Sequence, residues 1–224
     1  RVWHYQLVHH GLWDYDLPAA PVLLDIIVDG RPIKAVAQVT KQAFCFVFDR
    51  LTGEPVWPIV ERSVPASQMP GELASPTQPF PTKPAAFDRQ GITVDDLIDF
   101  TPEIRAKAEA MAADWVLAPL YTPPSEQVQV MMPGTLGGAD WAGAAADPRT
   151  GVLYVPSKTE PRRLWLSEPQ SSNAAGRFRY VGDARRFGGP WGLPFTKPPY
   201  GRLTAIDLNT GEHKWMTPTG RGPK

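Results

Sequence analysis

Short runs of β-branched and apolar residues, each ended by turn-forming residues, dominate the hydrophobic pattern of the chain. The clearest run is Val22–Val28, which Asp29-Gly30 closes with a typical hairpin turn. Runs of the same kind lie at 33–39, 43–48, 127–132, 152–155, 177–181 and 202–206. Strands at this density, joined by Gly and Pro turns, predict an all-β sandwich, barrel or propeller.

One sequence pattern recurs and narrows this choice. An apolar strand runs into Asp-x-x-Thr-Gly at 49–53, 147–151 and 207–211, and two copies carry a tryptophan at the same offset, Trp57 and Trp215. The Asp and Thr side chains can bond turn amides, and the Gly supplies a positive φ. Unrelated hairpins can share such turns. The common tryptophan offset, however, favours repeated β-propeller units in which the aromatic ring packs between neighbouring sheets.

The segment 60–125 departs from this repeat. Residues 63–84 are rich in Pro, Ser, Gln and Thr, which predicts a long ordered loop and not a strand pair. Thr101-Pro102 is a helix start, with Thr as N-cap and Pro at the first helical position. Apolar residues at helical spacing predict one helix over 102–116. We expect this insertion to pack against a single domain, 1–224, without a chemical role.

Composition excludes several other classes of protein. The 26 prolines exclude a mainly helical bundle, because each interior proline destabilises a helix by about 3 kcal/mol. Lys and Arg number 23, as do Asp and Glu, so no net charge attracts nucleic acid. A single cysteine, Cys45, excludes an internal disulfide and a CxxC zinc site. Because the chain begins at Arg1, we expect it to be a piece of a longer protein.

The densest cluster of polar and aromatic residues lies at 5–16. If this segment is extended, His9 and His10 point to opposite faces, whereas Asp14 and Asp16 project from the same face. Paired carboxylates suit a hard cation such as Ca²⁺, or leave one acid as a general base. An Asx-turn after a buried Trp is the structural alternative. A metal-dependent hydrolase that uses all four side chains is a weaker interpretation, because the histidines diverge.

Several motifs together resemble the pyrroloquinoline quinone (PQQ)-dependent dehydrogenases, closest in style to the membrane-type quinoprotein glucose dehydrogenases. The stretches that carry the likeness are His-His-x-Leu-Trp-Asp-Tyr-Asp-Leu-Pro at 9–18, Thr-Lys-Gln-Ala-Phe at 40–44 leading into 47–55, and the segments 75–84, 121–125, 137–141 and 198–202. They cover essentially the whole chain in the family's order. The resemblance implies an eight-bladed propeller stitched by tryptophan docking. At about four strands per blade, this chain supplies only part of the ring, with one inserted helix, and the remaining blades are its partners.

The same resemblance implies roles for three residues. Asp14 falls at the catalytic base, which takes the hydroxyl proton of the substrate while hydride moves to PQQ. Lys41 falls at the cofactor-binding lysine, whose charge stabilises a negative quinone oxygen. Asp14 and Asp16 are the implied metal ligands in this chain, for Ca²⁺, Mg²⁺ or a lanthanide. These roles require Asp14 and Lys41 to meet at one pocket near the propeller axis, within about 12 Å.

The resemblance therefore implies a fragment of a periplasmic enzyme, with any inner-membrane anchor outside this chain. The whole enzyme would oxidise a sugar or alcohol hydroxyl and pass electrons to quinone or a cytochrome. A non-catalytic propeller that binds protein or glycan is the alternative, and it has no need of Asp14 and Lys41 at one pocket. An open arc of blades exposes sheet faces, so we expect the isolated chain to associate or to be poorly soluble.

Overall fold

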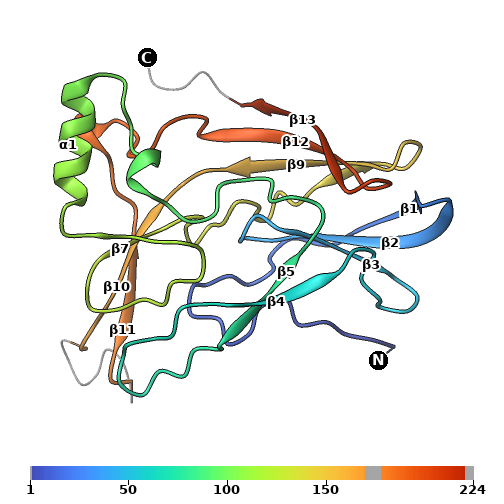
Figure 1. Cartoon of the computed structure of the whole chain (residues 1–224), viewed down its shortest axis with the longest axis horizontal. Helices are drawn as coiled ribbons and strands as arrows, with labels where there is room; N and C mark the ends of the chain where they lie inside the picture. The colour runs from blue at the N-terminus through green and yellow to red at the C-terminus, as the bar shows by residue number, and fades with distance from the viewer. Residues whose placement is uncertain (1, 170–177, 220–224) are drawn as a thin grey trace.

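The computed structural model describes residues 2–169 and 178–219, and strands dominate it (Figure 1). The strands are β1 (Val22–Val28), β2 (Arg31–Val39), β3 (Cys45–Asp49), β4 (Ile59–Ser63), β5 (Thr77–Pro81), β6 (Val116–Leu117), β7 (Gln129–Met131), β8 (Ala145–Asp147), β9 (Val152–Lys158), β10 (Arg162–Ser167), β11 (Val181–Arg185), β12 (Gly201–Asp207) and β13 (Glu212–Pro218). The helical elements are α1 (Pro102–Ala112) and the 3₁₀ turns η1 (Val94–Asp96) and η2 (Pro190–Gly192). The predicted all-β class with one inserted helix is confirmed.

The described strands form four separate sheets, in which every pair is antiparallel except β6 with β7. Their orders are β1-β2-β3, β13-β12-β9-β8, β11-β10-β7-β6 and β4-β5. The first two sheets pack together through one apolar core, in which Val47 of β3, Val155 of β9 and Ile206 of β12 are all buried. Figure 1 shows β9, β12 and β13 lying above β1–β3, with their strands running across the view in similar directions. This face-to-face sheet packing is the arrangement that the repeat predicted.

The three Asp-x-x-Thr-Gly segments form the same turn. In each, the Gly amide donates to the Asp carbonyl, and the Asp carboxylate accepts from the amide two residues further on. The amide-to-carbonyl distances are 2.8 Å (Gly53 to Asp49), 3.0 Å (Gly151 to Asp147) and 2.7 Å (Gly211 to Asp207). The φ values of these glycines are 80°, 72° and 75°. The repeat is therefore a structural unit, as its sequence predicts.

Indole rings rest on two of these turn glycines. A Cβ added to Gly211 would lie 3.0 Å from the ring of Trp57, and one added to Gly53 would lie 2.6 Å from the ring of Trp3. These contacts link one repeat to the next, so Trp57 packs between sheets as expected. Trp215 behaves differently. It lies on the edge strand β13, is 44% exposed, and packs across Ala205 against Tyr154 of β9, with ring centroids 5.9 Å apart.

The prediction of a loop without strands over 63–84 is wrong. Strand β5 pairs antiparallel with β4, and Pro79 stands opposite Glu61. Pro79 and Pro81 are two residues apart, so both missing N–H groups lie on the same edge of the strand. That edge faces away from β4. Because the sheet has only two strands among the described residues, no third strand requires N–H donors there. The prolines are therefore compatible with an edge strand, which composition alone did not indicate.

Two further boundaries differ from the prediction. The strand predicted at 177–181 begins outside the described residues, and β11 starts at Val181, where the predicted strand ends. Its limits follow from pairing with β10, which places Val181 opposite Ser167. Helix α1 ends at Ala112 instead of 116, because the chain turns there to enter β6.

The start and the buried face of α1 agree with the prediction. Thr101 Oγ1 accepts a hydrogen bond from the Ile104 amide at 3.2 Å. Ala108 and Ala112 are buried against Val130 and Phe195, so the helix covers the β7 end of its sheet, at the left of Figure 1. Within the described residues, no helix is long and apolar enough to cross a membrane.

Candidate active site

Lys41 lies in a tight turn between β2 and β3. The Thr40 amide donates to the Phe44 carbonyl at 2.9 Å, and the Ala43 amide donates to the Thr40 carbonyl at 3.0 Å. Thr40 Oγ1 also accepts from the Phe44 amide at 3.1 Å. Lys41 therefore precedes the strand, since β3 begins only at Cys45. The turn nevertheless holds the lysine rigidly, and only 8% of its side chain is exposed.

The segment that carries the histidines and aspartates is not a strand. Between residue 2 and β1 there is no strand, and both His10 (φ 40°) and Asp14 (φ 59°) adopt the left-handed conformation. The premise of an extended backbone is wrong, because side-chain anchors shape this segment instead. Trp13 Nε1 donates to a backbone carbonyl at 2.7 Å, and so does the Tyr15 hydroxyl, also at 2.7 Å. With these two rings buried, the alternating Asp14 and Asp16 face the opposite way, as predicted.

The two aspartates and Lys41 converge. Lys41 Nζ lies 2.5 Å from Asp16 Oδ1, 2.9 Å from the Asp14 carbonyl and 3.4 Å from Asp14 Oδ2. The aspartate side chains are 67% and 63% exposed, whereas the lysine stem beneath them is buried. The requirement that Asp14 and Lys41 approach within about 12 Å is therefore met at contact distance. The site is an ammonium group buried under a pair of solvent-facing carboxylates.

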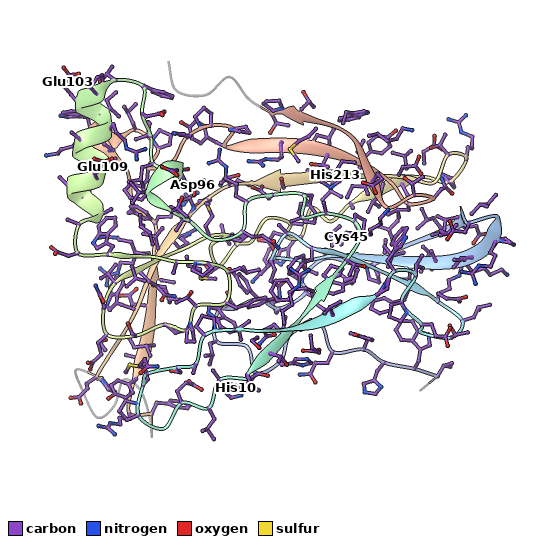
Figure 2. All side chains as sticks on the ribbon, in the orientation of Figure 1. His10, Cys45, Asp96, Glu103, Glu109 and His213 are labelled. Carbon is purple, nitrogen blue, oxygen red and sulfur yellow. The ribbon has the colours of Figure 1, made fainter. Side chains whose placement is uncertain are left out.

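The histidines do not join this group. His9 Nε2 pairs with Glu61 Oε1 at 2.9 Å, and His10 Nε2 pairs with Glu72 Oε1 at 2.9 Å. Figure 2 shows His10 at the rim of the molecule. Partial burial raises the pKa of Glu61, but hydrogen bonds from His9 and Thr77 outweigh it and hold this pKa below its usual value. A hydrolase site built from all four side chains is therefore not formed.

The residues that could hold a metal supply only part of a coordination shell. Ca²⁺ takes six to eight oxygen ligands, and Asp14 and Asp16 offer four carboxylate oxygens at most. Among the residues that the structure describes, no group of three or more His, Cys, Asp and Glu side chains could hold a metal ion. The Asp pair therefore fits a hard cation only if further oxygen ligands, such as backbone carbonyls, water or side chains of other blades, complete the shell.

The fit to a quinone cofactor is better. An ammonium group has three N–H donors, and the Lys41 contact to Asp14 Oδ2 is the longest of its three. One donor can therefore turn to a ligand oxygen without breaking the other two bonds. Next to Lys41 in the sequence, the fully buried Gln42 side chain makes no well-formed hydrogen bond, and neither does the Tyr121 hydroxyl. The two side chains nevertheless lie close enough for Gln42 to offset part of the rise in the Tyr121 pKa that burial causes. Sequence reasoning missed this weakly satisfied polar pair, because amide and phenol side chains carry no distinct motif.

A second polar group borders a cleft of about 260 Å³. Glu160 is surrounded by Lys158, Arg162 and Arg186. The hydrogen bond from Arg186 is the main cause that lowers the pKa of Glu160 to about 2, against the opposing effect of partial burial. Sequence analysis did not identify this cluster, because its charged residues are spread over 158–186 and only the fold assembles them.

Comparison with known proteins gives a consistent result. Residues 1–224 match the family described as "PQQ: Glucose/ethanol/alcohol dehydrogenase, beta-propeller domain". The chain is 35% identical to the quinoprotein glucose dehydrogenase of Escherichia coli (strain K12), over 97% of this chain and 30% of that protein. It is 32% identical to the quinate/shikimate dehydrogenase (quinone) of Acinetobacter baylyi, over 97% of this chain and 29% of that protein. The chain thus spans about 30% of the length of these relatives.

A solved structure supports the fold. The europium-containing methanol dehydrogenase superposes with a TM-score of 0.53 at 21% identity, covering 95% of this chain and 30% of that one. Together with the Asp-x-x-Thr-Gly turns and their docked indoles, this likeness identifies the sheets as part of a propeller. The chain belongs to the PQQ-dependent dehydrogenase family and forms a part of its glucose/ethanol/alcohol dehydrogenase β-propeller domain.

Proposed function

We propose that this chain supplies the base and the cofactor-contacting lysine of a PQQ-dependent dehydrogenase that oxidises a hydroxyl group of a sugar or alcohol. The convergence of Asp14 and Asp16 on Lys41 Nζ is the observation that carries the proposal. Membership of the family supports it, and so do the relatives' names, which include glucose, quinate and glycerol dehydrogenases.

Asp14 acts as the general base in this proposal. Its carboxylate faces solvent while its backbone carbonyl is tied to Lys41, so the acid is exposed yet held in place. A positioned carboxylate of this kind can take the hydroxyl proton of a substrate that approaches from the open side. PQQ, when bound, supplies the hydride acceptor.

Lys41 orients the cofactor and stabilises negative charge on it. The buried stem fixes the ammonium group, and burial away from water strengthens its electrostatic effect on a ligand oxygen. Asp16 accepts the shortest of the three Lys41 hydrogen bonds and keeps Nζ on the substrate side. In the complete propeller, Asp14 and Asp16 also contribute ligands to a hard cation, Ca²⁺, Mg²⁺ or a lanthanide, with the other ligands on other blades.

A quinone or cytochrome electron acceptor and a periplasmic location complete the proposal. The word quinone in the name of the quinate/shikimate dehydrogenase supports the first. The second follows from the family resemblance, with any membrane anchor outside these residues.

The test is Asp14→Asn in the complete protein, reconstituted with PQQ and Ca²⁺ and assayed by dye reduction. The substitution keeps the shape but removes the proton acceptor, so kcat should fall by at least ~10²-fold, while PQQ absorbance in the reconstituted protein stays. Asp95→Asn, at an exposed acid of η1, is the control and should leave the rate unchanged. Near-normal turnover of Asp14→Asn with saturating PQQ and Ca²⁺ places the base elsewhere. No turnover of any sugar or alcohol by the wild-type protein favours the non-catalytic binding propeller.

A further inference from the structure

A second turn of the chain, residues 134–138, lies directly against the backbone of Lys41. The Gly137 amide donates to the Gly134 carbonyl at 2.8 Å, which closes this turn, and Gly137 has a φ of 74°. A Cβ added to Gly137 would lie 2.4 Å from the Lys41 Cα atom and 2.5 Å from its Cβ and Cγ. No side chain fits at such a distance, so only glycine permits this approach.

The next residue joins the Lys41 turn to β9. The Gly138 amide donates to the Lys41 carbonyl at 2.8 Å, and the Gly138 carbonyl accepts from the Lys158 amide at 3.1 Å. A Cβ added to Gly138 would lie 2.9 Å from the Ala43 Cβ. One residue therefore connects the backbone that carries the ammonium group to the last residue of a central strand.

The 134–138 turn is also held from its other side. A Cβ added to Gly134 would lie 2.5 Å from the Glu160 carbonyl oxygen and 2.5 Å from Arg162 Cγ. The turn is thus wedged between the Lys41 backbone and the start of β10. Close-packed interiors transmit small shifts instead of absorbing them. Because Glu160 and Arg162 back the 134–138 turn on its other side, a group inserted at Gly137 pushes against the backbone and side chain of Lys41.

We propose that Gly137 is a positioning residue for Lys41. By allowing the 134–138 turn to rest on the Lys41 Cα atom, it sets the depth of the lysine and keeps Nζ within bonding distance of Asp14 and Asp16. Its effect on turnover rests on the proposed function, whereas its effect on the lysine does not. Charge-assisted hydrogen bonds depend steeply on distance and angle, so a displacement of the Lys41 backbone weakens them and exposes the amine.

The test uses Gly137→Ala in the complete protein, with two glycine controls that separate backbone strain from contact. Gly30 has the same φ of 74°, but its added Cβ meets nothing within 4 Å. Gly91 has a φ of 77°, and its added Cβ lies 2.8 Å from Pro119 Cα, with no Lys41 atom among its nearest neighbours. Gly30→Ala therefore reports strain alone, and Gly91→Ala reports strain together with a clash elsewhere.

The first measurement is the rate at which an amine-reactive reagent labels Lys41, relative to exposed Lys34, by peptide mass spectrometry. Gly137→Ala should raise this ratio roughly fivefold, the factor expected when an ion pair is lost, and both controls should leave it unchanged. The second measurement is kcat with saturating PQQ and Ca²⁺, which should fall at least tenfold in Gly137→Ala only.

Gly138→Ala keeps the proposal testable if Gly137→Ala fails to fold. Its added Cβ lies 2.9 Å from the Ala43 Cβ and no nearer than 3.4 Å to the Ala43 Cα and the Asp88 Cβ, so it should give the same change in Lys41 labelling at a smaller size. An unchanged ratio in the folded glycine variant, or an equal rise in Gly91→Ala, overturns the proposal. Lys41→Met separates the two proposals. If Lys41→Met keeps full activity, the proposed function fails. If Lys41→Met abolishes activity but Gly137→Ala shows normal labelling of Lys41 and normal turnover, the positioning role fails.

Discussion

Lys41 owes its position to contacts made by single residues from distant parts of the chain. Gln90 Nε2 donates to the Gln42 carbonyl at 2.7 Å, and the Phe87 amide donates to the Ala43 carbonyl at 3.1 Å. Two backbone carbonyls that follow Lys41 in the turn are therefore satisfied before any ligand arrives. These contacts hold the lysine stem buried under two exposed carboxylates. Chemistry at this site depends on the charge around Nζ.

We expect Lys41→Met to keep the fold and lose the reaction. Met has a similar length and fills the buried channel of the lysine stem, whereas the ammonium group is gone. Turnover with saturating PQQ should fall by about 10²–10³-fold, as when one preorganised electrostatic contact is removed. Lys41→Arg should retain more activity than Lys41→Met, because it keeps the charge. Lys34→Met, on the exposed face of β2, is the matched control, and an equal loss there contradicts a specific role for Lys41.

Glu160 should make stability depend on pH in a defined range. Its pKa is about 2 in the folded protein, below the ordinary value of 4.5, so the folded state favours the ionised form. This contribution is fully present above pH 4.5 and is lost as the pH falls toward 2. Melting temperatures of wild type and Glu160→Gln should therefore differ above this range and converge within it. Exposed Glu126→Gln should follow wild type throughout, and a constant gap for Glu160→Gln contradicts the assignment.

At the scale of elements, β5 connects the two-stranded β4-β5 sheet to the segment that carries Asp14. Gln78 is fully buried and bonds His9 twice, accepting from its amide at 2.9 Å and donating to its carbonyl at 2.6 Å. One side chain thus replaces a strand partner for a segment that forms no strand. The pairing of β4 with β5 that composition did not predict is what brings Gln78 to this position.

Gln78→Ala should loosen the Asp14 segment more than it harms the rest of the fold. It leaves a partly buried amide and carbonyl of His9 without partners, which costs about 1–3 kcal/mol for each such group. Hydrogen exchange of the amides at 9–16 should accelerate, while those of β9 and β12 stay protected. Gln127→Ala, at an exposed glutamine, serves as the control. Equal acceleration across all strands indicates global destabilisation and contradicts a local anchoring role.

At the scale of the whole molecule, the described sheets leave apolar side chains exposed on an edge strand. On β1, the outward-facing Leu23 and Ile27 are 63% and 60% exposed, and β1 is an edge strand of its sheet. Exposed apolar side chains beside unpaired backbone groups favour association. A closed propeller ring removes this problem by adding neighbouring blades.

The isolated chain, 1–224, should therefore self-associate. Light scattering should give a mass above 24.7 kDa that rises with concentration. The double substitution Leu23→Lys and Ile27→Lys should reduce this association, because charge on an edge strand opposes pairing. A monodisperse wild-type monomer with a cooperative melt contradicts the prediction.

The features that sequence alone determined are local ones. The Asp-x-x-Thr-Gly turns, the β1 hairpin and the start of α1 each depend on a few neighbouring residues, whose backbone preferences and side-chain bonds act over one turn. The alternation of Trp13 and Tyr15 with Asp14 and Asp16 was also predictable, even though the segment is not a strand. The family motifs, in addition, identified the candidate site residues.

Tertiary structure decided which of these residues meet. Strand β10 and the β4–β5 pair went unpredicted, because their limits depend on partners far along the chain and not on their own composition. Lys41 reaches Asp14 and Asp16 across 27 and 25 residues, and Gly137 contacts it from almost a hundred residues further on. Such contacts follow from how sheets pack and where turns close. A charge pattern along one chain carries no record of these distances, so the geometry of the site follows only from the fold that brings its parts together.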